Sequence, residues 1–246
     1  FHPEKPLVLS AGLDGTVRVW EIPKPVTPVL GHSQSVAAVA VTPDGKTMAT
    51  ASLDKSVRLS HVADGQPKLA ITDFPQPIQS MAITSKNQQL AVGDVTGDIW
   101  IRSSENGAMR SNWGGHVGPV TAIQYLGEEQ LVSTGGDGTL KTWKLPLSPP
   151  QTQKTHDQEI SSLVVTHDGT RLISAGLDEM IRVYNAETLQ QTGSWKSTIG
   201  PITALTISAD DKLLVTASNT GKWQSWSFPE AVEKEQKSAH DVAIHA

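Results

Sequence analysis

The stretch Leu13-Asp14-Gly15-Thr16-Val17-Arg18-Val19-Trp20 returns five more times along this chain in altered form. The turn positions of the six copies are 14, 54, 96, 137, 178 and 220, which are 40, 42, 41, 41 and 42 residues apart. A period of this size predicts a repeat architecture. The other copies are Leu53–Ser60, Val95–Arg102, Gly136–Trp143, Leu177–Tyr184 and Asn219–Trp226.

Short runs of alternating apolar residues lie between the copies and predict β-strands. Val36–Val41, Thr47–Ser52 and Val57–Leu59 are rich in Val, Thr and Ala and show a period of two residues. A looser, more polar outer strand is expected around Pro67–Thr72 and around Leu189–Gly193. Each repeat is therefore predicted to be a four-stranded antiparallel sheet. Turn residues that join the first two strands stand at 43–46, 167–170 and 209–212.

A second set of positions recurs with nearly the same spacing as the turn positions. In each repeat, one position stands four residues before the first apolar residue of the first strand. In the five unbroken repeats, 17 or 18 residues separate that apolar residue from the turn position. The landmark pairs are His32 and Val36, Phe74 and Ile78, His116 and Val120, His156 and Ile160, Thr198 and Ile202, and His240 and Ile244.

Composition favours a single globular domain covering residues 1–246. The chain is 37% hydrophobic and 18% charged, and its formal net charge of -5 gives no general attraction to nucleic acid or to an anionic membrane. It has no cysteine, which excludes disulfides and thiolate metal sites, and no apolar run approaches the ~20 residues of a membrane span. The compartment is not determined by these features.

These landmarks resemble the WD40-repeat β-propeller family over essentially the whole chain. The resemblance is carried by Gly31-His32 and Gly115-His116 before a first strand, by the Asp of the turns, and by Trp20, Trp143 and Trp226 at the end of a third strand. The Trp-Asp dipeptide itself is missing from these three positions. The resemblance implies an all-β propeller whose blades are four-stranded antiparallel sheets.

The two ends of the chain are interpreted as halves of one blade. His240–Ala246 has the pattern of the start of a first strand, and Phe1-His2-Pro3 has the pattern of its end. Joining them leaves no open sheet edge, so six blades are expected. The alternative is a seventh repeat or a neighbouring module beyond Phe1 and Ala246, as in a fragment of a longer multidomain protein.

The resemblance implies a structural hydrogen-bond network of His, Ser or Thr, Asp and Trp inside each blade. Buried polar groups of these kinds can satisfy one another and stiffen the sheet. The third and sixth repeats lack most of this network. The implied sets are His116, Ser133, Asp137 and Trp143; His240, Ser10, Asp14 and Trp20; His32, Thr50 and Asp54, with Ser60 in the place of Trp; and His156, Ser174 and Asp178, which end in Tyr184.

No catalytic, cofactor or metal site is predicted. Ser, His and Asp are the residues of an acyl-transfer triad, but they recur at the repeat period and no Gly-x-Ser-x-Gly motif accompanies them. The glycine-rich stretch 133–138 lies between two strands, which favours a hairpin turn over a phosphate loop. His2, His240, Asp241 and His245 match no metal-site spacing.

The resemblance implies that partners bind on the face that carries the His loops and the Asp turns. Four of the six residues before the turn position are large and apolar. They are either a binding patch or a cover over the mouth of the channel. The positions expected on this face are Leu13, Leu53, Val95, Gly136, Leu177 and Asn219 before the turns, and Ser35, Ala37, Gln79, Thr121, Glu159, Ser161 and Thr203 beside the first strands.

The function expected from these features is a non-catalytic scaffold that binds a protein or peptide. Nucleic acid, membrane and small-molecule partners are not expected. Two alternatives are a propeller hydrolase or lyase with a polar cluster facing the channel, and a purely structural spacer in an assembly. The first would need a polar cluster that falls outside the repeat, and none stands out in the sequence.

Overall fold

The chain is all-β in the residues that the computed structural model describes, namely 7–11, 17–21, 24–29, 31–42, 44–84, 89–145 and 150–238. Within these ranges there are twenty-three strands and no helix. They form five four-stranded sheets and one sheet with three strands. The chain divides into two compact units, unit 1 (Phe1–Glu128) and unit 2 (Glu129–Ala246).

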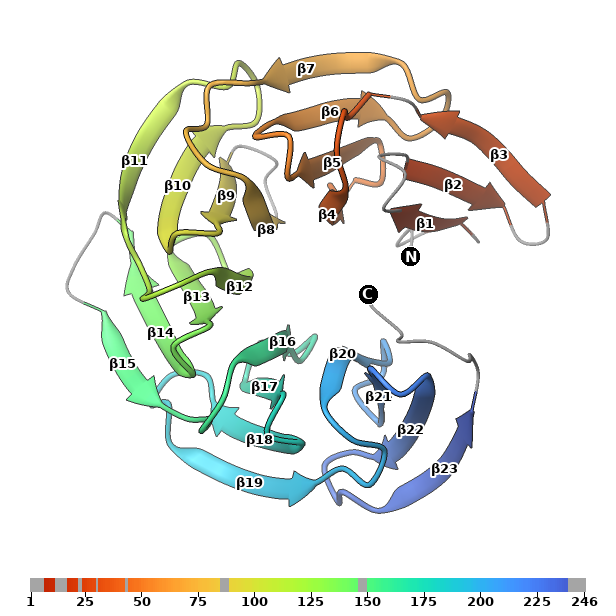
Figure 1. Ribbon diagram of the computed structural model, residues 1–246, viewed down its shortest axis with the longest axis vertical. Helices are drawn as coiled ribbons and strands as arrows, with labels where there is room; N and C mark the ends of the chain where they lie inside the picture. The colour runs from red at the N-terminus through yellow and green to blue at the C-terminus, as the bar shows by residue number, and fades with distance from the viewer. Residues whose placement is uncertain are drawn as a thin grey trace. The chain divides into compact units, whose positions relative to one another are not determined.

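Unit 1 begins with the three-stranded sheet and continues with two complete sheets. Strands β4, β8 and β12 neighbour one another, while β7 and β11 lie farthest from them (Figure 1). The strands are β1 (Leu7–Ala11), β2 (Val17–Glu21), β3 (Lys24–Val29), β4 (Val36–Val41), β5 (Thr47–Ser52), β6 (Val57–His61), β7 (Pro67–Ile71), β8 (Ile78–Ile83), β9 (Gln89–Asp94), β10 (Asp98–Ser103), β11 (Met109–Gly114) and β12 (Val120–Leu126).

Unit 2 repeats the same antiparallel arrangement. Strand β16 lies beside β20, while β19 and β23 are the outer strands of their sheets (Figure 1). Every four-stranded sheet keeps the order of the chain. The strands are β13 (Gln130–Gly135), β14 (Thr139–Lys144), β15 (Gln151–Lys154), β16 (Ile160–Val165), β17 (Arg171–Gly176), β18 (Met180–Asn185), β19 (Gln191–Lys196), β20 (Ile202–Ile207), β21 (Leu213–Ser218), β22 (Lys222–Ser227) and β23 (Glu233–Ser238).

The predicted boundaries agree with most of these strands, and one outer strand differs. Val36–Val41 and Thr47–Ser52 coincide with β4 and β5, but β19 begins at Gln191 instead of Leu189. Leu189 is buried and has a φ of 56° in the tight turn that follows β18. Its amide donates to the Asn185 carbonyl, and Asn185 Oδ1 accepts from Thr188 N at 2.9 Å. This turn delays the start of the outer strand.

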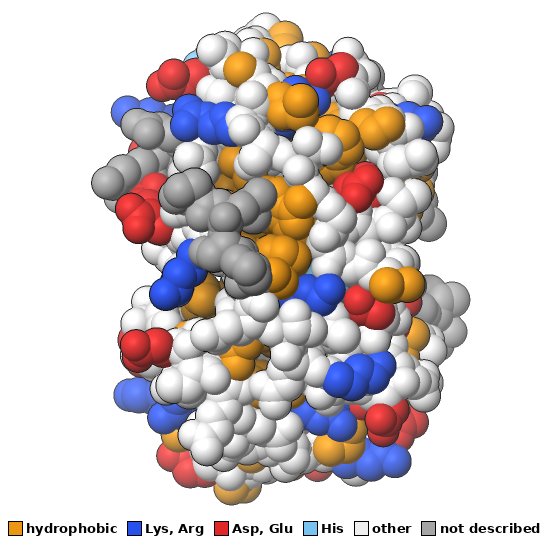
Figure 2. Space-filling model, turned by 90° about the vertical axis from the view of Figure 1, so that its left-hand side faces the viewer, with side chains coloured by type: hydrophobic (Ala, Val, Ile, Leu, Met, Phe, Trp, Pro, Cys, Tyr) orange, Lys and Arg blue, Asp and Glu red, His pale blue; other side chains and the backbone are white. Residues whose placement is uncertain are grey.

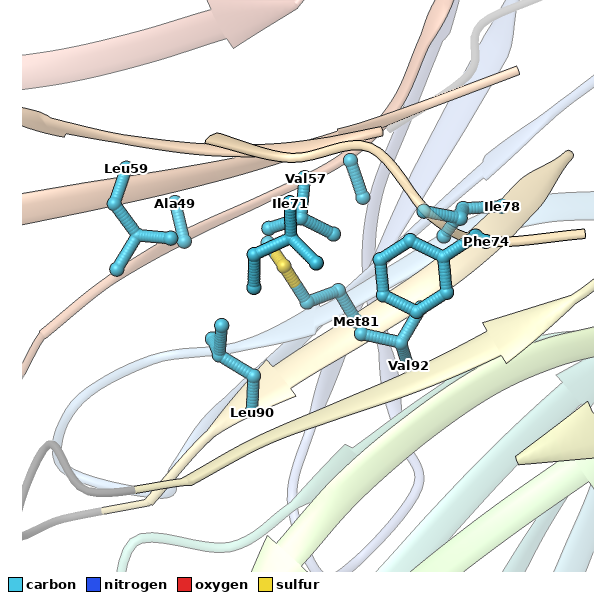
Figure 3. Packing of buried hydrophobic residues seen from close by; sticks show 10 residues of the cluster. Ala49, Val57, Leu59, Ile71, Phe74, Ile78, Met81, Leu90 and Val92 are labelled. Atoms are coloured by element: carbon cyan, nitrogen blue, oxygen red, sulfur yellow. The ribbon is translucent and has the colours of Figure 1, made fainter. Parts of the chain in front are cut away.

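The core of unit 1 forms where neighbouring sheets pack face to face. Val57 and Leu59 alternate with polar residues along β6, and they pack with Ile78 of β8 and with Leu90 and Val92 of β9 (Figure 3). All five side chains are buried, because the period of two places them on one face of their strands. A second cluster in unit 2 is built in the same way from β17, β18, β20, β21 and β22.

Candidate functional site at the turn end of the sheets

The residues before the turns are joined to the starts of the first strands by one recurring backbone hydrogen bond. Leu53 N donates to Ser35 O at 3.0 Å, and Val95 N donates to Pro77 O at 3.0 Å. In unit 2, Leu177 N donates to Glu159 O at 3.0 Å and Asn219 N donates to Pro201 O at 3.2 Å. The two groups of predicted face residues therefore lie side by side at the same end of each of these sheets.

A β-bulge recurs at the start of four first strands. The pairing skips one residue after Val36, Ile78, Ile160 and Ile202, and the skipped residues are Ala37, Gln79, Ser161 and Thr203. A bulge bends the strand and redirects the side chain of the extra residue. All four residues belong to the predicted binding face, so the same backbone device positions them in every case.

The predicted face residues differ in how much of them is free for a partner. Leu53, Val95 and Leu177 are half-buried, while Gln79 and Asn219 are exposed. Ser35, Ala37, Thr121, Glu159, Ser161 and Thr203 are half-buried as well. The Ser161 hydroxyl donates to the Ile202 carbonyl at 2.6 Å and so links two first strands. Leu13 lies outside the described residues.

A buried hydrogen-bond chain lies under this face in the β4–β7 sheet. His32 Nδ1 is 3.0 Å from Asp54 Oδ2, and His32 Nε2 is 2.8 Å from Thr50 Oγ1. These distances fit a neutral imidazole that donates from Nδ1 to the carboxylate and accepts from the Thr50 hydroxyl at Nε2. Ser56 Oγ also donates to Asp54 Oδ1 at 2.6 Å. The chain fixes the loop before β4 to the turn between β5 and β6.

The β16–β19 sheet carries the corresponding chain with a different fourth member. His156 lies 2.8 Å from both Asp178 Oδ1 and Ser174 Oγ. Arg182 Nη1 donates to Asp178 Oδ2 at 2.9 Å. Ser174 is fully buried, so its hydroxyl cannot reach a substrate despite the Ser-His-Asp geometry. This arrangement acts as an internal brace.

The structure describes only part of the other two predicted hydrogen-bond networks. Trp143 Nε1 donates to Ser133 Oγ at 2.9 Å, and Thr139 Oγ1 donates to Asp137 Oδ1 at 2.7 Å. His116 is buried. His240 and Asp14 lie outside the described residues, and only the backbone of Ser10 and Trp20 is described.

In the third and sixth repeats the network contains Asp94 and Gln224, two buried residues that are not among the predicted ones, while Thr198, Thr216 and Trp226 of the sixth repeat are members that the family pattern retains there. Asp94 is fully buried, and its Oδ2 accepts from Trp100 Nε1 at 3.1 Å. In the sixth repeat the buried Gln224 donates to Thr198 Oγ1 at 2.6 Å, and Trp226 Nε1 donates to Thr216 Oγ1 at 3.3 Å. The signal for Asp94 is the run Asp94-Val95-Thr96-Gly97, in which the acid stands two residues before the turn position.

The buried histidines have lowered pKa values. Burial lowers the pKa of His32 from 6.5, and the hydrogen bond to Asp54 opposes this only in part. Burial has the same effect on the pKa of His156, opposed by Asp178. Burial alone would raise the pKa of Asp54, but hydrogen bonds from Ser56, Ser33 and His32 outweigh it and lower that pKa below 3.8. Both imidazoles are therefore neutral at neutral pH.

These shifts predict a loss of stability in mild acid. Because the folded-state pKa of His32 and His156 lies below 6.5, the unfolded chain binds more protons there, and the free energy of unfolding falls as the pH drops below 6.5. A second loss begins near pH 3.8, where the aspartates of the unfolded chain bind protons while the lowered pKa values of Asp54 and Asp178 keep them ionised in the folded chain.

Urea unfolding at a series of pH values from about 7.5 to about 5 checks the first loss. A His32→Asn, His156→Asn double variant is the control and should show a flatter profile. An unchanged wild-type stability across this range would contradict the prediction.

Metal and membrane features are absent from the described part of the chain. No group of three or more His, Asp or Glu side chains is arranged there to hold a metal ion. His2, His240, Asp241 and His245 lie outside the described residues. No helix long and apolar enough to span a membrane occurs in the described ranges.

Comparison with known proteins identifies repeats of one kind. A family model described as "WD domain, G-beta repeat" matches residues 1–21, 23–59, 107–144 and 147–185, which are more than half of the chain. The chain is 26% identical over 266 residues to "Telomerase protein component 1" of Mus musculus, covering 98% of this chain and 10% of that protein. It is 24% identical over 188 residues to "Protein groucho" of Drosophila melanogaster, covering 75% and 25%. It is 28% identical over 199 residues to "Pre-mRNA-processing factor 19" of Bos taurus, covering 74% and 38%. The chain thus spans well under half of each of these relatives.

Proposed function

Because this chain belongs to the WD domain, G-beta repeat family, we propose that it is a non-catalytic scaffold that binds a protein or peptide on the turn end of its sheets. We also propose that residues 1–246 form one six-bladed propeller, with the segment after Ser238 as the partner of β1. The five four-stranded sheets and the three-stranded β1-β2-β3 sheet support this blade count.

The observation that carries the proposal is the recurrence of one backbone arrangement at this end of the sheets. The same hydrogen bond from the turn to the first strand occurs in four repeats, and the same bulge occurs beside it. A rigid backbone presents side chains with little loss of conformational entropy on binding. Leu53, Val95 and Leu177 are then partly exposed apolar residues among polar neighbours, as in the central part of a protein interface.

Charge supports a protein partner over nucleic acid. The formal net charge is -5, and basic and acidic side chains are interspersed on the face shown in Figure 2. Binding to a phosphate backbone needs a concentration of Lys and Arg side chains. The buried position of Ser174 and His156 also supports a non-catalytic role, because neither side chain is accessible to a substrate.

Substitution of the half-buried leucines tests the binding face. We expect a Leu53→Asp, Leu177→Asp variant of the full-length protein to lose at least about tenfold in affinity for its protein partners, since two carboxylates would be buried in an apolar contact. Affinity is measured by quantitative pull-down followed by titration with each purified partner. The control is Leu213→Asp, which changes an exposed leucine at the opposite end of β21.

The result separates the scaffold from a structural spacer. Near-ultraviolet circular dichroism establishes that both variants are folded. Partners retained equally by the double variant and by Leu213→Asp would refute this face as the binding site. The absence of any partner for the wild type would favour the spacer.

A further inference from the structure

The β4–β7 sheet lacks the aromatic ring that fills the end of β14, β18 and β22. Trp143, Tyr184 and Trp226 are the next-to-last residues of those strands and are buried. Ser60 stands at the same register position, since it pairs with Met48 as Trp143 pairs with Leu131. The two indoles donate to the hydroxyls of Ser133 and Thr216, and Thr50 provides the corresponding hydroxyl here.

A pocket of about 320 Å³ lies where this ring is missing. Both Thr50 and Ser60 line it, and Pro67 and Leu69 of the outer strand β7 contribute apolar surface. Its volume is at the lower end of the range of about 300–1,000 Å³ that is typical of ligand pockets. A side chain of tryptophan size is therefore a suitable occupant. The pocket is distinct from the turn residues of the proposed binding face.

Arg58 lines this pocket, and part of its guanidinium group has no hydrogen-bond partner. Its Nε is buried and unpaired, although a buried charged donor ordinarily has an acceptor. At the equivalent position of β18, Arg182 donates to Asp178 Oδ2 at 2.9 Å. In the β4–β7 sheet, Ser56 Oγ binds Asp54 at 2.6 Å and takes that role, which leaves the Arg58 guanidinium for another acceptor.

The other charged group of the pocket is also cationic. Lys68 lines it and donates from Nζ to Thr47 Oγ1 at 2.9 Å. No acidic side chain is among the described residues that line the pocket. Two cations beside an indole-sized space are complementary to an aromatic ring that carries a carboxylate, because a planar guanidinium binds a carboxylate with two parallel hydrogen bonds.

We propose that this pocket binds an aromatic carboxylate. The ring fills the place of the missing indole against Pro67 and Leu69, and the carboxylate accepts from Arg58. The same chemistry is offered by a free aromatic acid and by a peptide with a C-terminal aromatic residue. This site would be independent of the proposed partner face at the turn end.

Titration with N-acetyltryptophan and with a short peptide ending in Trp tests the site, with calorimetric detection. We expect saturable binding of one or both, and a loss of at least about tenfold when the carboxylate is replaced by an amide. If the natural ligand is a free aromatic acid, N-acetyltryptophan should bind more tightly than the peptide. If it is a peptide with a C-terminal aromatic residue, the peptide should bind more tightly.

Two variants and a matched control complete the test. Ser60→Trp should abolish binding and raise the Tm, because the new ring fills the pocket. Arg58→Gln should weaken binding at least about tenfold, whereas Arg182→Gln, at the same strand position of β18, should leave it unchanged. No saturation up to about 1 mM of either ligand would overturn the proposal, and so would undiminished binding to Arg58→Gln or to a folded Ser60→Trp. Binding of protein partners by the Leu53→Asp, Leu177→Asp variant is measured separately. The proposal for the pocket and the proposal for the binding face can therefore fail independently of each other.

Discussion

Asp94→Ala is expected to lower the free energy of unfolding by about 3–5 kcal/mol, because it removes a fully buried carboxylate that is the common acceptor of five hydrogen bonds. Asp94 is fully buried. Its Oδ1 accepts from the Thr96 hydroxyl at 2.8 Å and from the backbone N of Thr96, Gly97 and Asp98 at 2.9, 3.0 and 3.0 Å. Its Oδ2 accepts from Trp100 Nε1. Alanine would remove all five hydrogen bonds at once and would leave the buried Gly97 amide without this acceptor.

Urea unfolding followed by tryptophan fluorescence measures this effect. The matched control is Asp168→Ala, which removes an aspartate from another turn where Oδ1 accepts from Thr166, from Thr170 Oγ1 and from Thr170 N. Asp168 is exposed, so water replaces its hydrogen bonds and the change should be small. Similar losses for the two variants would show that burial of Asp94 does not determine its contribution.

Phe74→Ala is expected to lower the free energy of unfolding by about 3–5 kcal/mol through the cavity that it opens. Phe74 is 4% exposed and belongs to the cluster shown in Figure 3. Its ring meets that of Trp100 edge-on, with centroids 6.1 Å apart, and the Arg102 guanidinium carbon lies 4.9 Å from its centroid. The substitution removes both contacts together with the buried area.

The same unfolding assay checks this loss, with Met109→Ala as the control because Met109 is 56% exposed on the outer strand β11. A further variant, Phe74→His, introduces the residue found at the equivalent positions 32, 116 and 156. It should also destabilise the protein, because the imidazole would lie beside the Arg102 cation with no acid at position 96 to bind it. A stability equal to that of the wild type would contradict this account of the third repeat.

The position of each sheet could be predicted from sequence because it depends on local signals. Alternation of apolar residues and turn chemistry act over a few residues, so Val36–Val41 and Thr47–Ser52 have the predicted bounds. The turns at 167–170 and 209–212 form as expected, with Gly169 and Asp211 at positive φ. The outer strand β19 was placed too early, because the left-handed turn at Leu189 depends on the Asn185 side chain.

The polar interior was predictable only where the repeat kept its usual residues. His32 and His156 have the contacts that the family pattern implies. Asp94 and Gln224 were missed because each stands at a position other than the one that carries the network elsewhere. The donors to Asp94 come from the adjoining turn and from Trp100 on β10. Gln224 donates to Thr198 in the loop before β20, and a repeat alignment does not show that contact.

By itself, the sequence determined the repeat, the strands and the turns, since these follow from the spacing of residues along one stretch of chain. Only the tertiary structure decided which polar group meets which. Arg182 and Arg58 occupy equivalent positions, yet one binds an aspartate and the other faces a pocket. Ser56 donates a hydrogen bond from its side chain to Asp54, whereas Met180, at the equivalent position beside Asp178, has no side-chain donor. In addition, Ser60 leaves the space of an aromatic ring empty.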